Sequence, residues 1–203
     1  MIAIVNLELG NIASVENMVK RMGGETIVTN EKSLLLKAKK IILPGVGRFD
    51  YGINQMHRYD LFTLIKDLAL NGTPLLGICL GMQLLGKNSD EGKEEGLSLV
   101  DMNFHKFEFP DTEISMRVPH VGWNQINVTR LNKIIQKRDE GQRFYFTHSY
   151  YGKCIDTNDI IATTNYGLNF VSAINRQNVY GVQFHPEKSH RFGMELIENF
   201  IQL

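Results

Sequence analysis

Residues 74–85 read PLLGICLGMQLL, and this stretch predicts a buried strand that turns directly into a helix. The run from Leu75 to Ile78 is continuously apolar, which is typical of a strand covered on both faces in a parallel sheet. From Leu80 to Leu85 the apolar residues recur at helical spacing. Cys79 is therefore expected at the strand-to-helix turn.

Glycines stand two residues before and two residues after this cysteine. The order Gly77-Ile78-Cys79-Leu80-Gly81 has the form of a nucleophile elbow, in which glycines avoid collisions across a sharp turn. A helix N-terminus favours thiolate, and the backbone N–H of Leu80 would be free to bind a developing oxyanion. The alternative is a small, inert core residue, because buried cysteines are common.

The rest of the chain predicts one α/β domain over residues 1–203. Strands are expected at 1–6, 25–29 and 39–44, with helices at about 11–22 and 61–68. After about Gly96, strand-like pieces at 143–151, 159–167, 169–175 and 178–184 precede a helix that begins near Lys188. We expect a central, mostly parallel sheet flanked by helices, with a β-rich second half.

Composition limits the classes of function. The 203 residues include 22 basic and 22 acidic side chains, and this balance gives no support for nucleic-acid binding. The sequence has no run of about 18 apolar residues for a membrane span and no signal-peptide pattern. Cys79 and Cys154 lie far apart, so we expect a cytoplasmic protein with reduced thiols, and we interpret Cys154 as a structural or surface residue.

The segment GVQFHPEKS, residues 181–189, supplies a candidate base. A strand is expected to end at His185, and Glu187 follows two residues later, on the same side of an extended backbone. Pro186 also biases His185 toward extended geometry. Glu187 would orient the imidazole while its other nitrogen takes the thiol proton. A metal pair, which needs further ligands, and a solvated surface pair are the alternatives.

The segment LPGVGRF, residues 43–49, is a candidate oxyanion loop. Gly45 and Gly47 flank Val46 after a predicted strand, so backbone N–H groups can approach a ligand closely. Open α/β sheets bind ligands at the carboxyl ends of their strands. An ordinary turn remains possible, whereas a phosphate loop lacks its Lys-Ser/Thr pair here.

Several segments together resemble the class I (triad) glutamine amidotransferases, over nearly the whole chain. These are LPGVGRFD, PLLGICLGMQLLGKNSDEG, RVPHVGWN, YFTHSYY and GVQFHPEKS. PHVGWN with THSYY looks most like the glutaminase subunits of imidazole glycerol phosphate synthases. The resemblance implies the flavodoxin-like fold of that class, and it implies no metal and no organic cofactor.

The resemblance also implies a reaction. Cys79 would attack the side-chain amide carbon of glutamine, His185 would act as base and then acid, and water would hydrolyse the thioester to glutamate. The oxyanion would be held by the Leu80 N–H and by an N–H of the Val46–Gly47 loop. The residues that match the family's glutamine-binding positions are Gln83, Glu91, His148, Ser149 and Tyr150.

Each glutamine-binding assignment has a simpler alternative. Gln83 lies one helical turn after Cys79 and can face the same pocket, but it could be a solvated helix residue. Glu91 lies in the acidic run SDEGKEEG, which is typical of a loop surface. The segment His148-Ser149-Tyr150 could simply cap the end of a strand.

A partner is implied as well. The family's glutaminases dock on a (β/α)₈-barrel synthase subunit, as a heterodimer that passes ammonia internally. The products would be imidazole glycerol phosphate and AICAR, in histidine biosynthesis, and the glutaminase would be stimulated when the barrel binds its own substrate. Trp123, the single tryptophan, is either a core residue or a contact with this partner.

Two stretches depart from the family's pattern. Residues 6–11 read NLELGN, with Glu8 where glycine is expected, and residues 96–107 read GLSLVDMNFHKF, with fewer glycines. They leave open a paralogous glutaminase that feeds a sugar-nucleotide-modifying synthase for surface polysaccharides. A stand-alone cysteine hydrolase and a non-catalytic regulatory subunit are the hypotheses from other classes.

Overall fold

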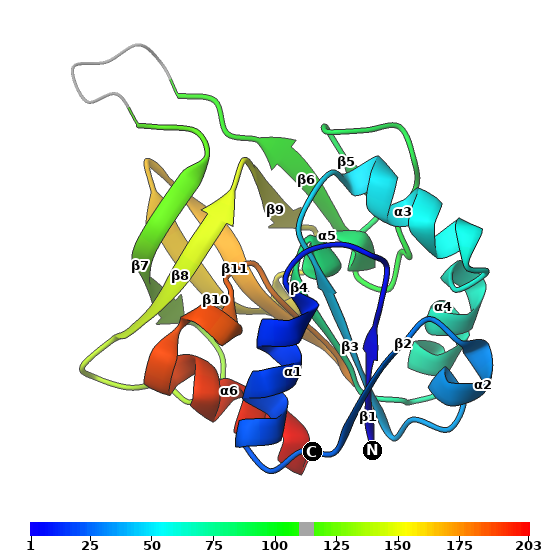
Figure 1. Ribbon diagram of the computed structural model, residues 1–203. Coiled ribbons are helices and arrows are strands. Elements are labelled where there is room, and N and C mark those ends of the chain that lie inside the picture. Colours follow the sequence, from blue (N-terminus) through cyan, green and yellow to red (C-terminus); the bar gives the residue numbers. More distant parts are fainter. Residues whose placement is uncertain (110–115) are drawn as a thin grey trace.

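The computed structural model describes residues 1–109 and 116–203 (Figure 1). Its helices are α1 (Ile12–Arg21), α2 (Lys32–Leu35), α3 (Phe49–Arg58), α4 (Phe62–Leu70), α5 (Leu80–Leu85) and α6 (His190–Gln202), with short 3₁₀ turns η1 (Thr157–Asp159) and η2 (Pro186–Lys188). Its strands are β1 (Ile2–Val5), β2 (Thr26–Thr29), β3 (Lys40–Gly45), β4 (Leu75–Cys79), β5 (Asn88–Ser89), β6 (Met102–Lys106), β7 (His120–Val128), β8 (Gln142–His148), β9 (Tyr150–Cys154), β10 (Ile160–Tyr166), β11 (Leu168–Arg176) and β12 (Val179–Val182).

The sheet begins with five parallel strands in the order β2-β1-β3-β4-β12. The strand that contains Leu75 to Cys79 lies between β3 and β12 and is buried at every position. This agrees with its continuously apolar sequence. The α/β class with a central, mostly parallel sheet flanked by helices is confirmed.

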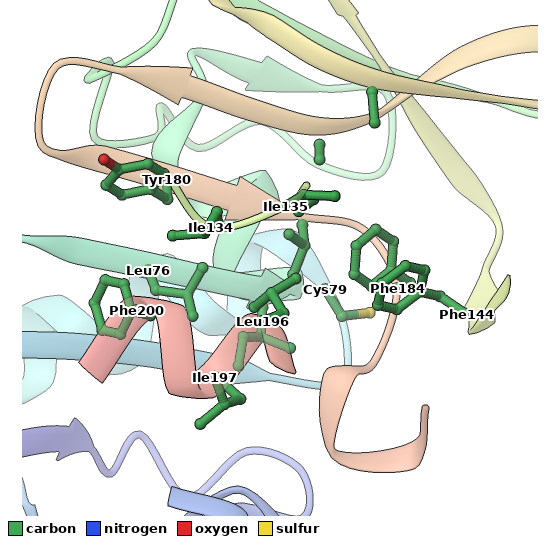
Figure 2. Packing of buried hydrophobic residues seen from close by; sticks show 14 of the residues in the cluster. Leu76, Cys79, Ile134, Ile135, Phe144, Tyr180, Phe184, Leu196, Ile197 and Phe200 are labelled. Atoms are coloured by element: carbon green, nitrogen blue, oxygen red, sulfur yellow. The ribbon is translucent and has the colours of Figure 1, made fainter. Parts of the chain in front are cut away.

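Helices cover both faces of this parallel part. Apolar side chains of α1 and α6, such as Val19 and Phe200, pack with Ile4 and Ile78 on one face. Side chains of α3 and α4, such as Ile65, pack with the alternate strand residues on the other. Figure 2 shows part of the first cluster, including Cys79. Period-two alternation in the strands thus builds two cores from one sheet.

The β-rich second half extends the sheet with antiparallel pairs in the order β12-β11-β10-β7-β8. The last strand returns to the parallel part, because Tyr145 of β8 forms an isolated antiparallel bridge with His185. The His185 N–H donates to the Tyr145 carbonyl at 2.8 Å. The second half therefore fixes the backbone of the candidate base.

Some elements differ from the sequence expectation. The third strand does not stop at Pro44 but continues to Gly45, and both residues keep register partners in β4. The strand expected to end at His185 ends at Val182. Helix α3 and strand β7 were not predicted. In α3, Gly52 and Gln55 are buried among the apolar residues and obscure the helical periodicity.

In the part of the chain that the structure describes, no helix combines the length and apolarity needed to cross a membrane.

Candidate active site

Cys79 lies at a strained turn between β4 and α5. Its backbone has φ +54° and ψ −109°, a conformation that residues other than glycine rarely adopt. A Cβ on Gly81 would lie 1.7 Å from the Leu43 carbonyl oxygen, and one on Gly77 would lie 2.7 Å from backbone atoms of Gly81. The glycines are therefore required by the turn, as in a nucleophile elbow.

The Cys79 thiol makes two hydrogen bonds within the described residues. Cys79 Sγ donates to the Thr147 carbonyl oxygen at 3.8 Å and accepts from Nε2 of Gln183 at 3.7 Å. Gln183 is fully buried, and its Oε1 accepts from Nε2 of Gln83 at 3.3 Å. Neither Thr147 nor Gln183 was among the predicted site residues. Gln183 stands two residues before His185 in the segment GVQFHPEKS, which was the available signal.

His185 and Glu187 form a buried pair. His185 Nδ1 lies 2.7 Å from Oε1 of Glu187, and the side chains are 2% and 5% exposed. Their expected arrangement along an extended strand is wrong: His185 is extended, but Glu187 belongs to the 3₁₀ turn η2. The tight turn brings the carboxylate back to the ring, so the two residues still meet.

The other ring nitrogen of the histidine is available. His185 Nε2 is buried and has no hydrogen-bond partner among the described residues. Burial lowers the pKa of His185, but the neighbouring Cys79 sulfur and the Glu187 carboxylate outweigh burial and raise this pKa to about 10. The imidazole is therefore placed to accept a proton from Cys79.

The candidate oxyanion loop follows directly from the sheet. Gly45 is the register partner of Cys79 in the parallel pair of β3 and β4. Val46 and Gly47 come next, and Gly47 has φ +134°, which favours glycine. Across the turn, Leu80 is the first residue of α5, where a backbone N–H lacks an intrahelical acceptor.

A pocket of about 210 Å³ joins these elements. Its lining residues are Val46, Gly47, Cys79, Leu80, Gln83, Glu91, Pro119, Thr147, His148, Ser149 and Tyr150. All predicted oxyanion and glutamine-binding residues line it together with Cys79. His185 and Glu187 do not line it. Pro119 and Thr147 were not predicted, since nothing in an apolar or β-branched residue alone indicates a site.

Glu91 and His148 are held by specific contacts in this pocket. Glu91 Oε2 accepts the Phe49 N–H at 2.8 Å. His148 Nδ1 donates to the Tyr150 carbonyl oxygen at 2.7 Å, and its Nε2 lies 2.9 Å from Nδ1 of His120. Burial lowers the pKa of His120 to about 4 and that of His148 to about 3. Both histidines are therefore neutral at pH 7.

The departure at Glu8 has a local explanation. Its backbone φ is +59°, the left-handed region where glycine is favoured. Its carboxylate contacts side chains of α3, with Oε2 at 3.5 Å from Gln55 Nε2 and 3.8 Å from an Arg58 guanidinium nitrogen. Glu8 therefore keeps the left-handed backbone of this position while its side chain packs against α3.

Trp123 is 40% exposed on β7 and is not a core residue. Its ring stacks on His190, with centroids 5.2 Å apart and an interplanar angle of 2°. The two rings lie at a groove of about 410 Å³ that Arg143, Ser189, Arg191 and Phe192 also line. His190 is the second residue after η2, so this groove adjoins the segment that holds His185 and Glu187.

A second, polar cavity lacks the residue types found around Cys79. It measures about 540 Å³ and lies between β7, β10 and the segment before β8, where Gln125, Lys137 and Thr163 are among its lining residues. It has no cysteine and no histidine. Within residues 1–109 and 116–203, no cluster of three His, Cys, Asp or Glu side chains could hold a metal ion.

Comparisons with known structures support the fold. A solved structure of a glutamine amidotransferase is similar with a TM-score of 0.73 at 18% identity, over 97% of this chain and 98% of the other chain. The structure of PurLQS from Thermotoga maritima matches with a TM-score of 0.72 at 17% identity and covers 99% and 97%. At these identities the similarity concerns the fold alone.

Relatives found by sequence share more residues with this chain than the solved structures do. An "imidazole glycerol phosphate synthase subunit HisH 2" of Methanococcus maripaludis is 45% identical over 100% of this chain and 99% of its own. A protein with the same name from Pseudomonas aeruginosa is 44% identical over the full length of both chains. A HisH subunit of Sulfurimonas denitrificans is 40% identical over 98% and 97%.

The family model "Glutamine amidotransferase class-I" matches residues 5–203. The matched region includes the turn at Cys79, the Val46–Gly47 loop and the pair His185–Glu187. The resemblance recognised in the sequence is thus confirmed over nearly the whole chain, and this protein belongs to the class I glutamine amidotransferase family.

Proposed function

We propose that this chain is the glutaminase subunit of an imidazole glycerol phosphate synthase. It hydrolyses glutamine to glutamate and ammonia and supplies the ammonia to a barrel synthase subunit in histidine biosynthesis. The observation that carries the proposal is the 210 Å³ pocket, where Cys79 meets every predicted oxyanion and glutamine-binding residue. The HisH names of relatives at 40–45% identity support the pathway.

The first half-reaction acylates the cysteine. His185 Nε2 takes the thiol proton, and Cys79 Sγ forms a bond to the side-chain amide carbon of glutamine. The carbonyl oxygen becomes an oxyanion, which the N–H of Leu80 and an N–H of the Val46–Gly47 loop stabilise. His185 then returns its proton to the nitrogen as the carbon–nitrogen bond breaks, so ammonia leaves and a γ-glutamyl thioester remains.

The second half-reaction restores the enzyme. His185 removes a proton from water, and the resulting hydroxide attacks the thioester carbon within the same oxyanion hole. The carbon–sulfur bond breaks, glutamate leaves, and the thiolate recovers its proton from His185. Glu187, 2.7 Å from Nδ1, holds one ring orientation and stabilises the imidazolium in both halves.

The surroundings of the pocket account for glutamine as substrate. The Gln83 amide and the backbone around Ser149 offer hydrogen bonds, and the Glu91 carboxylate offers a partner for the α-ammonium group. Ammonia released into water is protonated and lost as a nucleophile. A partner that covers the site and receives ammonia directly is therefore part of the proposed function.

The exposed tryptophan groove supports the place of that partner. Trp123, stacked on His190, adjoins the 3₁₀ turn that carries Glu187. Exposed tryptophan and arginine side chains are typical anchors of protein interfaces. Docking here would place the barrel subunit next to the histidine–glutamate pair.

The test is glutamine hydrolysis by the purified chain, alone and with the same organism's barrel subunit loaded with its ribonucleotide substrate. We expect a low rate alone and a rise of at least tenfold in the loaded complex. A low rate without this response would contradict the pathway and move the search to a sugar-modifying synthase. A high rate without any partner would indicate a stand-alone hydrolase.

A further inference from the structure

The segment from Ser89 to Glu94 supplies a cap for helix α3. The first backbone N–H groups of any helix lack intrahelical acceptors, and the N-cap residue of α3, Arg48, provides no side-chain hydrogen bond. Instead, Glu91 Oε2 accepts the Phe49 N–H at 2.8 Å, from 42 residues away in the chain. A carboxylate at this position also interacts favourably with the helix dipole.

Helix α3 returns the contact. The Asp50 carboxylate accepts hydrogen bonds from the backbone N–H groups of Lys93 and Glu94, each at 3.0 Å. Gly92, the residue after Glu91, lies so close to Asp50 that an added Cβ would be 1.7 Å from Oδ1 of Asp50. The two segments therefore hold each other through reciprocal carboxylate–backbone hydrogen bonds, which we call the α3 clamp (Glu91, Gly92, Phe49 and Asp50).

The α3 clamp lies at one end of the oxyanion loop. Phe49 is fully buried and comes two residues after Gly47. The loop's other end is fixed by the sheet, where Gly45 pairs with Cys79. Val46 between these ends is 43% exposed. The Phe49–Glu91 hydrogen bond therefore restrains the loop on the side that the sheet does not hold.

Glu91 also faces the pocket. It lines the cavity beside Tyr150. Burial raises the pKa of the Tyr150 hydroxyl, the charge of Glu91 raises it further, and the opposite charge of Arg48 counteracts them. The second carboxylate oxygen, Oε1, has no protein donor among the described residues. One oxygen is thus used by the helix, and the other is available to a ligand.

We propose that Glu91 is a positioning residue that sets the oxyanion loop through the Phe49 N–H, in addition to pairing with the α-ammonium of glutamine. This inference rests on the proposed function. The same carboxylate then senses the substrate's charge and restrains the loop that stabilises the oxyanion. A glutamine bound without its ammonium on Glu91 would leave the loop less well placed.

Three variants separate the two roles of Glu91. Glu91→Gln removes the charge but keeps a carbonyl oxygen for the Phe49 N–H, and Glu91→Ala removes both. Asp50→Ala breaks the other half of the α3 clamp without touching the pocket. Glu95→Ala is the matched control, because Glu95 lies in the same acidic run and is exposed. Each variant is assayed with the barrel subunit for kcat and KM, and Phe49 amide exchange is measured by NMR.

We expect Glu91→Gln to raise the KM for glutamine at least tenfold with kcat within threefold of the wild type. Glu91→Ala should raise KM similarly, lower kcat at least tenfold and speed Phe49 amide exchange at least tenfold. Asp50→Ala should lower kcat about tenfold with KM within threefold. Equal kcat values for the two Glu91 variants, or unchanged exchange in Glu91→Ala, would overturn the inference.

The exchange measurement does not depend on glutamine hydrolysis. If the wild-type chain released no glutamate, the proposed function would fail, while protection of the Phe49 amide would still report whether Glu91 caps α3. If Glu91→Ala did not fold, the kcat of Asp50→Ala would decide: a wild-type value would contradict a positioning role for the α3 clamp.

Discussion

Gln183 Nε2 donates to the Cys79 thiol at 3.7 Å, and Gln83 donates in turn to Gln183 Oε1 at 3.3 Å. The Cys79 side chain is therefore held by a buried chain of two amides as well as by its backbone turn. Hydrogen bonds to charged groups are stronger than those to neutral groups. In the proposed mechanism, the amide chain would therefore assist the attack of Cys79 on glutamine.

We predict that Gln183→Leu lowers kcat/KM for glutamine about tenfold to a hundredfold. A hydrogen bond to a charged group contributes about 1.5–3 kcal/mol, and the variant also leaves Gln83 without its acceptor. Alkylation of Cys79 by iodoacetamide at a fixed pH should become slower. Gln136→Leu, at an exposed position, is the control. An unchanged alkylation rate would mean that Gln183 is only a packing residue.

The variant Glu187→Gln tests the role of the carboxylate charge next to His185. The amide can still accept from Nδ1 but no longer stabilises the imidazolium, so we predict a fall in kcat of about a hundredfold or more. The pKa of His185 in the folded protein, about 10, lies above its ordinary value of 6.5. Its stabilising contribution is therefore fully present below pH 6.5 and is lost as the pH rises through about 10.

The same pH dependence should appear in the stability of the protein. Replacing Glu187 should reduce the free energy of unfolding more at pH 6 than at pH 10, as measured by urea denaturation. Glu195→Gln removes a carboxylate from a more exposed pair with Arg138 and should show a smaller difference between the two pH values. Equal losses for Glu187→Gln at both pH values would contradict a charged His185.

The sharp turn at Cys79 predicts that Gly81 cannot be replaced by a residue with a side chain. Gly81→Ala places a Cβ 1.7 Å from the Leu43 carbonyl oxygen, a backbone atom of the central sheet that cannot move aside. We expect a loss of more than about 3 kcal/mol, seen as insoluble protein or a large drop in Tm. Gly72→Ala is the comparison: no atom lies within 4 Å, so only its φ of +92° is strained, at about 1 kcal/mol. Similar Tm values for both variants would refute the steric account of the elbow.

Sequence reasoning reached most of this site because each key residue lies in a short, patterned segment. The buried strand before Cys79 is an apolar run, its glycines have fixed spacing, and Gly45 and Gly47 surround Val46. What it missed depends on contacts between distant segments. Gln183 contributes because its side chain forms hydrogen bonds with Gln83 and Cys79, which are about 100 residues away in the chain. Likewise, Glu91 caps helix α3 from 42 residues away. The position of Gln183 beside His185 was a local signal, but neither contact can be predicted from one segment alone.

The buried pair His120–His148 predicts acid sensitivity. Their ring nitrogens lie 2.9 Å apart, so one donates and the other accepts, and both rings are neutral in the folded protein. Their folded pKa values, about 4 and 3, lie below the ordinary 6.5. The unfolded chain therefore binds more protons below pH 6.5, and stability falls as the pH decreases toward 4.

Each histidine should lower the free energy of unfolding by about 2 kcal/mol between pH 7 and pH 5, because each unit of difference in pKa corresponds to about 1.36 kcal/mol. His120→Phe keeps a ring that can stack on Phe146 and Tyr166 and should remove about half of this pH dependence. Urea denaturation at pH 7, 6 and 5 measures it. A variant with the wild-type slope would show that His120 is already charged in the native state.

Trp123→Ala tests the proposed partner surface. The indole is 40% exposed and stacks flat on His190, so it offers a rigid apolar face next to Arg143 and Arg191. Truncating a central aromatic anchor typically costs an interface 2 kcal/mol or more. We therefore predict that the Kd for the barrel subunit rises at least about tenfold, measured by calorimetry. Leu36→Ala removes an apolar side chain that is 60% exposed beside α2 and should leave the Kd unchanged. If both variants bound like the wild type, the barrel would have to dock on another face, and the stacked pair would serve only to hold the start of α6.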